Sequence, residues 1–329
     1  MLTRRRFAAA LAAGALAGRG GGARAQGFAP AAERARGIGQ LHAVVASVDG
    51  EIVLAEAVRG GGLNRPANVK SVSKTLIATL TGAAIARGVL PGVEAPIMPW
   101  LRRRAPGGLD PRIEEVTIED LLTMRSGLAR TSGPNYGAWV NSRDWVGYIL
   151  SRPVGEPGAR FSYSTGDFHL LAAVLTEAGG DSLLALARAW MGRPLGIEIP
   201  PWTRDPQGIY MGGNNMALSP EAMLAFAEAI RTGGAPLVPG DWIETSWRPR
   251  TRSPFSGHQY GYGWFLASMG GENLAYARGY GGQMIYVVPG VGLSVAITSD
   301  PDLPARSGGH IDDLHELLAE ELIPAARRA

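Results

Sequence analysis

The chain of 329 residues contains no cysteine and only five histidines. The lack of cysteine excludes disulfide bonds, thiol catalysis and thiolate metal sites together. The histidines are scattered, and none is paired at a spacing that indicates a metal site or a catalytic triad, so each is expected to be a surface or core residue. We therefore expect neither a metal ion nor an organic cofactor.

Lysine is also scarce. Of the 32 lysine and arginine residues, only Lys70 and Lys74 are lysines. Arginine stays protonated in proteins, whereas a lysine can lose its proton when it is buried or placed beside other positive charge. A lysine kept at position 74, in a chain that otherwise uses arginine for its cations, therefore suggests proton chemistry at that position.

Positive charge is not in excess over most of the chain. Residues 1–25 hold five arginines and no acids, which leaves 27 basic and 29 acidic residues in the remainder. The formal net charge of +3 therefore belongs to the N-terminal segment. No basic stripe remains that would indicate a nucleic-acid partner.

Residues 1–25 have the pattern of an export signal. Arginines at 4–6 precede an apolar run at 8–17 and a small-x-small cleavage pattern, Ala23-Arg24-Ala25, before Gln26. The paired arginines are typical of a twin-arginine signal. We expect a periplasmic or secreted protein without a stable membrane anchor once the signal is cleaved. An uncleaved anchor is the alternative, although the apolar run is too short to span a bilayer.

The stretch that carries the chemistry begins at Ser71. Ser71 and Lys74 are three residues apart, so on a helix that begins at Ser71 their side chains lie on one face, about one turn apart. A serine hydroxyl becomes a nucleophile when an adjacent base takes its proton. The run from Thr75 to Ala86 has no charged residue, which predicts a buried helix and a dry setting for Lys74. A chance Ser-x-x-Lys pattern, with Lys74 extending from a core helix to water, is the alternative.

Apolar, β-branched runs lie near both ends of the chain. Residues 41–48 and 51–57 flank Asp49-Gly50, which is a strong signal for a hairpin of two antiparallel strands. Further strands are expected at 260–265, 284–288 and 293–298.

Helical patterns fill the region between these strands. Thr117 to Asp120 is a capping-box pattern, and Ser219 followed by Pro220 is a typical helix start. A final helix is expected to begin at Asp312.

The order of these elements sets the fold class. Strands at both ends around a helical middle imply a sheet completed by two distant chain segments, with a helical insertion beside it. We therefore expect an α/β fold of the α+β type. Residues 26–88 and 245–329 would form a sheet domain flanked by helices, and residues 89–244 would form a mostly helical lobe.

Other candidate residues lie outside the Ser71 stretch. Tyr163 could hold a phenol near Lys74 and move a proton between Ser71 and a leaving group, or it could be an ordinary core aromatic. The glycine-rich turn from Gly279 to Gln283 would let backbone N–H groups approach a substrate, as an oxyanion hole requires, or it could be a tight turn without function. Tyr136 lies in a loop pattern and could rim a pocket.

Four segments, in order, resemble the motifs of one family. They are Ser71 to Thr75, Thr117 to Leu128, Pro157-Gly158 with Phe161 to Ser164, and Gly279 to Gln283 before Ile285 to Pro289. Together they resemble the serine β-lactamase and penicillin-recognising family, in its branch of class C β-lactamases, DD-peptidases, related esterases and nylon-oligomer hydrolases. The likeness covers roughly residues 40–325.

The resemblance implies roles for particular residues. Ser71 would be the acylated nucleophile and Lys74 its base partner, with Tyr163 as a second base that also activates the deacylating water. The oxyanion hole would be formed by the backbone N–H groups of Ser71 and Tyr280. An antiparallel sheet would lie beside an all-helical lobe, with the site in the cleft between them. The expected substrate-binding residues are Thr165, Gly279 and Tyr136.

The sequence departs from the family pattern at two places. The family's Tyr-x-Asn reads Tyr163-Ser164-Thr165 here, so a hydroxyl replaces the amide that contacts the substrate. The family's Lys-x-Gly or His-x-Gly reads Ala277-Arg278-Gly279, which leaves no cation at the first position. Both losses bear on the recognition of a lactam carboxylate more than on acyl transfer.

We therefore expect an exported serine hydrolase that acts on a small-molecule ester, amide or peptide substrate through an acyl-enzyme. A true β-lactamase or DD-peptidase is one alternative. A non-catalytic module that binds cell-wall peptide or senses penicillin is the other, and the Ser71, Lys74 and Tyr163 set argues against it.

Overall fold

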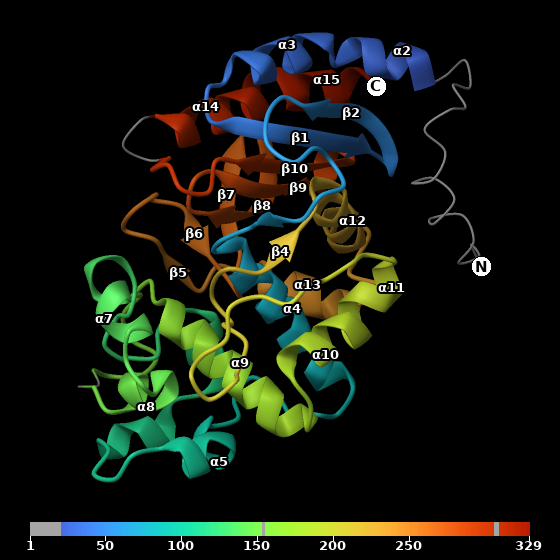
Figure 1. Ribbon diagram of the computed structural model, residues 1–329. Coiled ribbons are helices and arrows are strands. Elements are labelled where there is room, and N and C mark those ends of the chain that lie inside the picture. Colours follow the sequence, from blue (N-terminus) through green and yellow to red (C-terminus); the bar gives the residue numbers. More distant parts are fainter. Residues whose placement is uncertain (1–20, 153–154, 306–308) are drawn as a thin grey trace.

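The computed structural model describes residues 21–152, 155–305 and 309–329 (Figure 1). Residues 1–20 of the expected export signal lie outside this part of the chain, so the signal stays a prediction. In the described part, one eight-stranded sheet is built from two distant chain segments, as the sequence predicts.

The sheet has the strand order β2-β1-β10-β9-β8-β7-β6-β5, and its neighbouring strands are antiparallel. The strands are β1 (Leu41–Val48), β2 (Glu51–Ala57), β5 (Thr251–Arg252), β6 (Gln259–Tyr260), β7 (Phe265–Met269), β8 (Glu272–Gly279), β9 (Gln283–Val288) and β10 (Leu293–Ser299). A separate antiparallel pair consists of β3 (Ala67–Asn68) and β4 (Ala217–Leu218). Because β1 pairs with β10, the first hairpin is joined directly to the last strand.

Helices cover both faces of the sheet and form a lobe beside it (Figure 1). The longer helices are α2 (Gly21–Gly27), α3 (Ala29–Gly37), α4 (Val72–Ala86), α8 (Trp145–Leu150), α9 (Thr165–Gly179), α12 (Pro220–Arg231), α13 (Gly240–Ser246), α14 (His310–Glu316) and α15 (Ile323–Arg328). The short α-helices are α5 (Met98–Leu101), α6 (Ile118–Leu122), α7 (Tyr136–Val140), α10 (Leu183–Ala187) and α11 (Arg193–Leu195). Short 3₁₀ and π turns are η1 (Arg102–Arg104), η2 (Pro111–Glu115), η3 (Gly133–Asn135), η4 (Arg188–Gly192), η5 (Pro289–Val291) and η6 (Leu317–Leu322).

The helices of the two termini lie together on one face of the sheet, and α4 and α12 pack against the other (Figure 1). The lobe is arranged around α9, which contacts α4, α5, α6, α8 and α10. Although α12 comes from the range expected to form the helical lobe, it packs on β1, β9 and β10. The expected domain boundaries stay a prediction.

Helix α4 is buried along almost its whole length, as its charge-free sequence predicts. Its threonines do not leave polar groups unsatisfied, because each hydroxyl donates to a backbone carbonyl. Thr79 and Thr81 bond to carbonyls one turn back in the same helix, and Thr75 Oγ1 donates to Gly263 O at 2.6 Å. The helix can therefore cross the core and carry Lys74 into it.

The strand expected at 260–265 is wrong as a single element, because the chain breaks between β6 and β7. Gly263 has a φ of +73°, in the left-handed region that glycine tolerates. A Cβ at Gly261 would lie 2.0 Å from the carbonyl oxygen of Ser246. The alternating aromatic pattern is therefore interrupted to let this segment approach α13 and α4.

Local signals predict several element ends correctly. The Asp49-Gly50 hairpin is present, and both residues have positive φ. The capping box is complete, since Thr117 Oγ1 accepts from the backbone N of Asp120 and the Asp120 carboxylate accepts from the backbone N of Thr117. The final helix begins at His310 rather than at Asp312.

In the described ranges, no single helix is long and apolar enough to cross a membrane.

Candidate active site

Ser71 lies at the N-cap position of α4, where the chain enters the helix from β3. The residue before it, Lys70, has a φ of +50°, and its backbone N–H donates to Asn68 Oδ1 at 2.9 Å. The Ser71 side chain makes no capping bond to the helix. Its hydroxyl is therefore available to other groups, and Lys74 Nζ lies 3.0 Å from Ser71 Oγ.

Lys74 is held inside the protein by three oxygen partners. Only 2% of its surface is exposed, and its ammonium donates to Ser71 Oγ, to Thr165 Oγ1 at 3.3 Å and to Gly213 O at 2.6 Å. The Gly213 carbonyl can only accept, whereas the Ser71 hydroxyl can also donate. A neutral Lys74 can therefore keep its contact with Gly213 while it accepts the proton of Ser71.

Burial lowers the pKa of Lys74 from its usual range, because the charged form is poorly solvated there. The Tyr163 phenol opposes this effect by charge and hydrogen bonding, and so does the charge of Asp167, but burial has the larger influence. A lysine with a lowered pKa is the kind of base that a serine nucleophile needs.

Tyr163 lies on the segment that leads into α9, directly before its N-cap residue, Ser164. The ring is half-buried, and Lys74 Nζ lies 4.9 Å from its centroid. The neighbouring residue, Ser162, fixes the segment by donating its N–H to Met124 O at 2.8 Å. The structure therefore brings Tyr163 next to Ser71 and Lys74, from which it is far apart in the sequence.

Asp167 is a residue of this site that the sequence reading missed. It is 1% exposed, its Oδ2 accepts from Ser126 Oγ at 2.9 Å, and its Oδ1 is buried without a hydrogen-bond partner in the described part of the chain. Burial raises the pKa of Asp167 to about 7, while Ser126, Ser164 and Lys74 act in the opposite direction. The available signal was an acid in the first turn of a helix whose middle is apolar, four residues after Tyr163.

Thr165 was expected to contact substrate, but its hydroxyl is occupied inside the protein. The side chain is 4% exposed, and Oγ1 lies 2.9 Å from Ser132 Oγ as well as 3.3 Å from Lys74 Nζ. Thr165 therefore helps to orient the Lys74 amine in this structure. Direct contact with a substrate stays a prediction.

The expected oxyanion turn joins β8 to β9. Gly279, at the end of β8, is packed so closely on the segment before Ser71 that a Cβ there would lie 2.4 Å from Val69 O. Tyr280 follows and is 54% exposed. The turn and the nucleophile segment are therefore in contact, which is the arrangement that two converging backbone N–H groups require.

A buried polar network connects this turn to β10 and α14. Gln283 Nε2 donates to Ser299 O at 2.8 Å, Ser299 Oγ donates to Gly282 O at 3.0 Å, and His310 Nε2 lies 2.9 Å from Ser299 Oγ. These contacts tie the turn to β10 and to the start of α14. A satisfied buried network of this kind favours one rigid conformation of the turn.

Tyr136 is linked to the Lys74 surroundings through Asn214 rather than by a direct contact. Its hydroxyl accepts from Asn214 Nδ2 at 3.2 Å, and Asn214 follows Gly213, whose carbonyl accepts from Lys74. The ring is half-buried and packs edge-on against Trp139. Its contact with a substrate stays a prediction.

Across the described ranges, no group of three or more His, Asp or Glu side chains could hold a metal ion.

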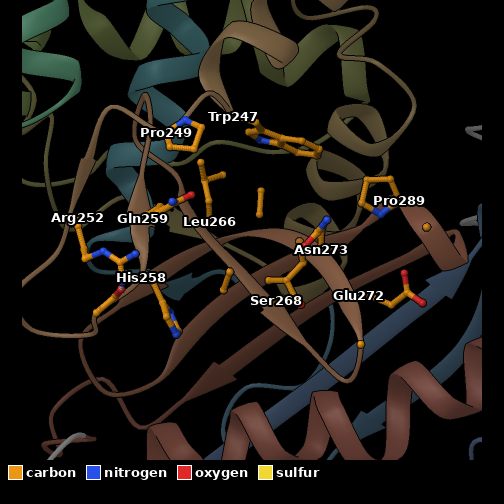
Figure 2. A pocket seen from close by; sticks show the side chains of 16 residues that line it. Trp247, Pro249, Arg252, His258, Gln259, Leu266, Ser268, Glu272, Asn273 and Pro289 are labelled. Atoms are coloured by element: carbon orange, nitrogen blue, oxygen red, sulfur yellow. Dashed lines mark hydrogen bonds between the residues drawn. The ribbon is translucent and has the colours of Figure 1, made fainter.

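Two cavities need to be distinguished. One, of about 580 Å³, is lined by Tyr163 and adjoins the site. Figure 2 shows the other, of about 860 Å³, whose lining includes Trp247 at the end of α13, Arg252 on β5, His258 before β6 and Glu272 on β8. None of the site residues described above lines the second cavity, and Tyr163 is the one among them that lines the first. The first cavity is therefore the one that adjoins the site.

Comparisons with known proteins agree with this fold. A family model described as beta-lactamase matches residues 40–320. The hydrolase EstCE1, described as having promiscuous acyltransferase activity, is similar at 17% identity and a TM-score of 0.74, over 92% of this chain and 100% of its own. A D-stereospecific amidohydrolase from Streptomyces sp. gives 20% identity and a TM-score of 0.67, over 88% of this chain and 97% of its own. A beta-lactamase from Mycobacterium bovis gives 17% identity and a TM-score of 0.69, over 90% of this chain and 99% of its own. At these identities the likeness shows a shared fold, and the comparison with curated proteins gives no match.

Proposed function

The chain belongs to the beta-lactamase family, and from that premise we propose that it is an exported serine hydrolase that cleaves an ester or amide through an acyl-enzyme. The observation that carries the proposal is the 3.0 Å contact between Lys74 Nζ and Ser71 Oγ in a buried setting. The proposed substrate is a small-molecule ester, amide or peptide. The hydrolase EstCE1 and the D-stereospecific amidohydrolase among the structural neighbours are consistent with a hydrolase function.

In the proposed acylation step, neutral Lys74 accepts the hydroxyl proton of Ser71 as Oγ attacks the carbonyl carbon of the substrate. The carbonyl becomes a tetrahedral oxyanion, which the backbone N–H groups of Ser71 and Tyr280 stabilise. As the bond to the leaving group breaks, Tyr163 donates its hydroxyl proton to the leaving atom and takes one from the Lys74 ammonium. The products are acyl-Ser71 and a free alcohol or amine, with Lys74 neutral again.

Deacylation reverses the proton path with water as the nucleophile. Tyr163 accepts a proton from the water while its own proton passes to Lys74, and the resulting hydroxide attacks the acyl carbon. When the bond to Ser71 breaks, Lys74 returns its proton to Oγ. The acid leaves, and the three residues regain their starting protonation.

Ser71→Ala tests the nucleophile. It should reduce the hydrolysis of phenyl acetate on the order of 1,000-fold or more, since the covalent route is lost. Ser268→Ala, at an exposed position on β7, is the control and should keep wild-type activity. A fluorophosphonate should add one adduct to the wild-type protein, at Ser71, as measured by intact mass and peptide mapping. Full activity in Ser71→Ala would rule out this nucleophile.

A β-lactamase or DD-peptidase activity is the second candidate, and Lys70 favours it. Although residue 277 supplies no cation, the Lys70 side chain lies against Gly279 and places Nζ 3.8 Å from Asp302 Oδ1. The Lys70 side chain therefore begins beside this turn, and its ammonium pairs with Asp302. Turnover of nitrocefin that falls in Lys70→Met would support this reading. Failure of nitrocefin turnover, together with failure of labelling by a fluorescent penicillin, would leave the esterase or amidase.

Export is proposed from the sequence of residues 1–25. The intact mass of the mature protein recovered outside the cytoplasm should equal that of a chain that begins at Gln26. Recovery of the uncut chain from the membrane fraction would instead indicate an anchor.

A further inference from the structure

The cavity beside Tyr163 has preformed walls. It is lined by residues 127–130, 155–156, 159–163 and 254–255, and is called the Tyr163 cavity below. One backbone hydrogen bond joins the first two segments, because Gly155 N donates to Gly127 O at 2.7 Å. A second fixes the third segment, because Ser162 N donates at 2.8 Å to Met124 O, three residues before the first segment. A cavity whose walls are bonded to one another does not need to be ordered by its ligand.

Part of the lining is apolar and aromatic. Leu128 is buried, Phe161 packs edge-on against Tyr260 at 5.5 Å, and Phe255 is 45% exposed at the cavity's edge. Such a surface suits a ligand with an apolar or aromatic frame.

The charged part of the lining is mainly positive. Arg130 is held in place, because its Nε donates to Ser132 O at 3.1 Å and its guanidinium lies 5.6 Å from the centroid of the Phe255 ring. Neither Arg130 nor Arg160 forms an ion pair with an acid of the described residues. Glu156 is the acid in the lining, and its charge also acts on Arg112, outside the cavity. Two guanidinium groups are therefore available to an anionic ligand.

Tyr163 relates the cavity to the reaction. In the mechanism above, its phenol gives a proton to the leaving atom, so the part of the substrate on the Tyr163 side is the part that leaves. We propose that the Tyr163 cavity binds the leaving group and selects an alcohol or amine that carries a carboxylate on an apolar frame. This inference rests on the proposed serine hydrolase function.

The experiment compares three esters. Phenyl acetate is neutral, 3-acetoxybenzoate carries a carboxylate on the leaving group, and monophenyl succinate carries one on the acyl group. Arg130→Gln and Arg160→Gln are each expected to lower kcat/KM for 3-acetoxybenzoate roughly 10-fold more than for phenyl acetate, the effect of one charged hydrogen bond. Arg103→Gln, at an exposed arginine on η1, is the matched control and should leave all three rates at the wild-type level.

The possible outcomes separate this inference from the proposed function. Equal losses on all three esters, or a larger loss on monophenyl succinate, would overturn the leaving-group assignment while ester hydrolysis stands. If wild-type protein neither hydrolyses phenyl acetate nor becomes acylated at Ser71, the proposed function fails and the inference fails with it. Should Arg130→Gln fold poorly by circular dichroism, Arg160→Gln decides the question, because Arg160 is exposed.

Discussion

Lys74 and Asp167 are buried ionisable side chains whose charges act on each other. Burial lowers the pKa of Lys74 and raises the pKa of Asp167 to about 7. The Asp167 charge raises the Lys74 pKa, and the Lys74 charge lowers the Asp167 pKa. The protonation of Asp167 therefore influences how readily Lys74 accepts the proton of Ser71.

Asp167→Asn should move the ascending limb of the kcat/KM profile to lower pH. The substitution removes a negative charge that raises the Lys74 pKa, so Lys74 becomes neutral at lower pH, by roughly 0.5–1 unit. The groups that face Asp167 are Ser126, Ser164, Lys74, Asp120 and Tyr260, and all are kept in this variant. The measurement is phenyl acetate hydrolysis from pH 5 to 10, and a limb that stays in place or moves to higher pH would contradict the coupling.

The same residue should make stability depend on pH. Because the folded pKa of about 7 lies above the usual 3.8, the folded protein keeps a proton that the unfolded chain releases. The wild-type free energy of unfolding should therefore fall relative to Asp167→Asn as pH rises from 4 to 7, by up to about 4 kcal/mol. Urea unfolding of both proteins at several pH values measures this difference, and parallel curves would contradict it.

At the scale of elements, α4 depends on close packing as well as on its apolar sequence. Gly82 lies against Trp242, and a Cβ at Gly82 would come within 2.3 Å of the indole. Gly82→Ala should therefore lower the free energy of unfolding by about 1–3 kcal/mol, despite the higher helix propensity of alanine.

The matched control for this prediction is Gly137→Ala on α7, where a Cβ would meet no atom within 4 Å. It should leave stability unchanged or raise it by up to about 1 kcal/mol. Thermal or urea unfolding measures both variants. Equal effects at the two glycines would show that the contact with Trp242 does not matter.

Element ends were predictable where the signal is local. The Asp49-Gly50 turn and the Thr117 capping box each depend on residues within four positions of one another. The break between β6 and β7 was not predictable in this way, because it follows from contacts of Gly261 and Gly263 with α13 and α4. Asp167 was missed for the same reason: its buried setting depends on Ser126, 41 positions away.

At the scale of the whole molecule, the two chain ends complete one face of the sheet (Figure 1). Phe28, directly before α3, is 1% exposed and packs in the core. Arg34 on α3 pairs with Glu316 and Glu320 near the C-terminus at 2.7 and 2.6 Å. Exposed ion pairs of this kind contribute little, so the apolar contact of Phe28 is the more important link.

Phe28→Ala should therefore lower the free energy of unfolding by about 3–5 kcal/mol, the usual effect of removing a buried aromatic ring. Leu303→Ala, at a side chain 45% exposed, is the surface control and should change stability by less than about 0.5 kcal/mol. The comparison should be made on the chain that begins at Gln26. A small effect of Phe28→Ala would mean that the N-terminal helix is dispensable for folding.

The general architecture followed from the order of strand and helix patterns, because a sheet formed from both chain ends leaves the middle of the chain as an insertion. How each helix packs could not be read from that order. The amphipathic α12 would suit either lobe by its sequence, and its contacts with β1, β9 and β10 become apparent only in three dimensions. The Tyr163 cavity is likewise formed by segments around positions 128, 160 and 255, which no sequence spacing connects.

The most direct test of the account is the rate at which a fluorophosphonate labels Ser71 as a function of pH, in wild-type protein and in Lys74→Arg. Arginine keeps the positive charge but cannot accept the serine proton. We expect the wild-type rate to rise along a limb whose pKa lies below 10.5, and the Lys74→Arg rate to be slower on the order of 1,000-fold at neutral pH. Equal labelling rates in the two proteins would contradict the role of Lys74 as the base.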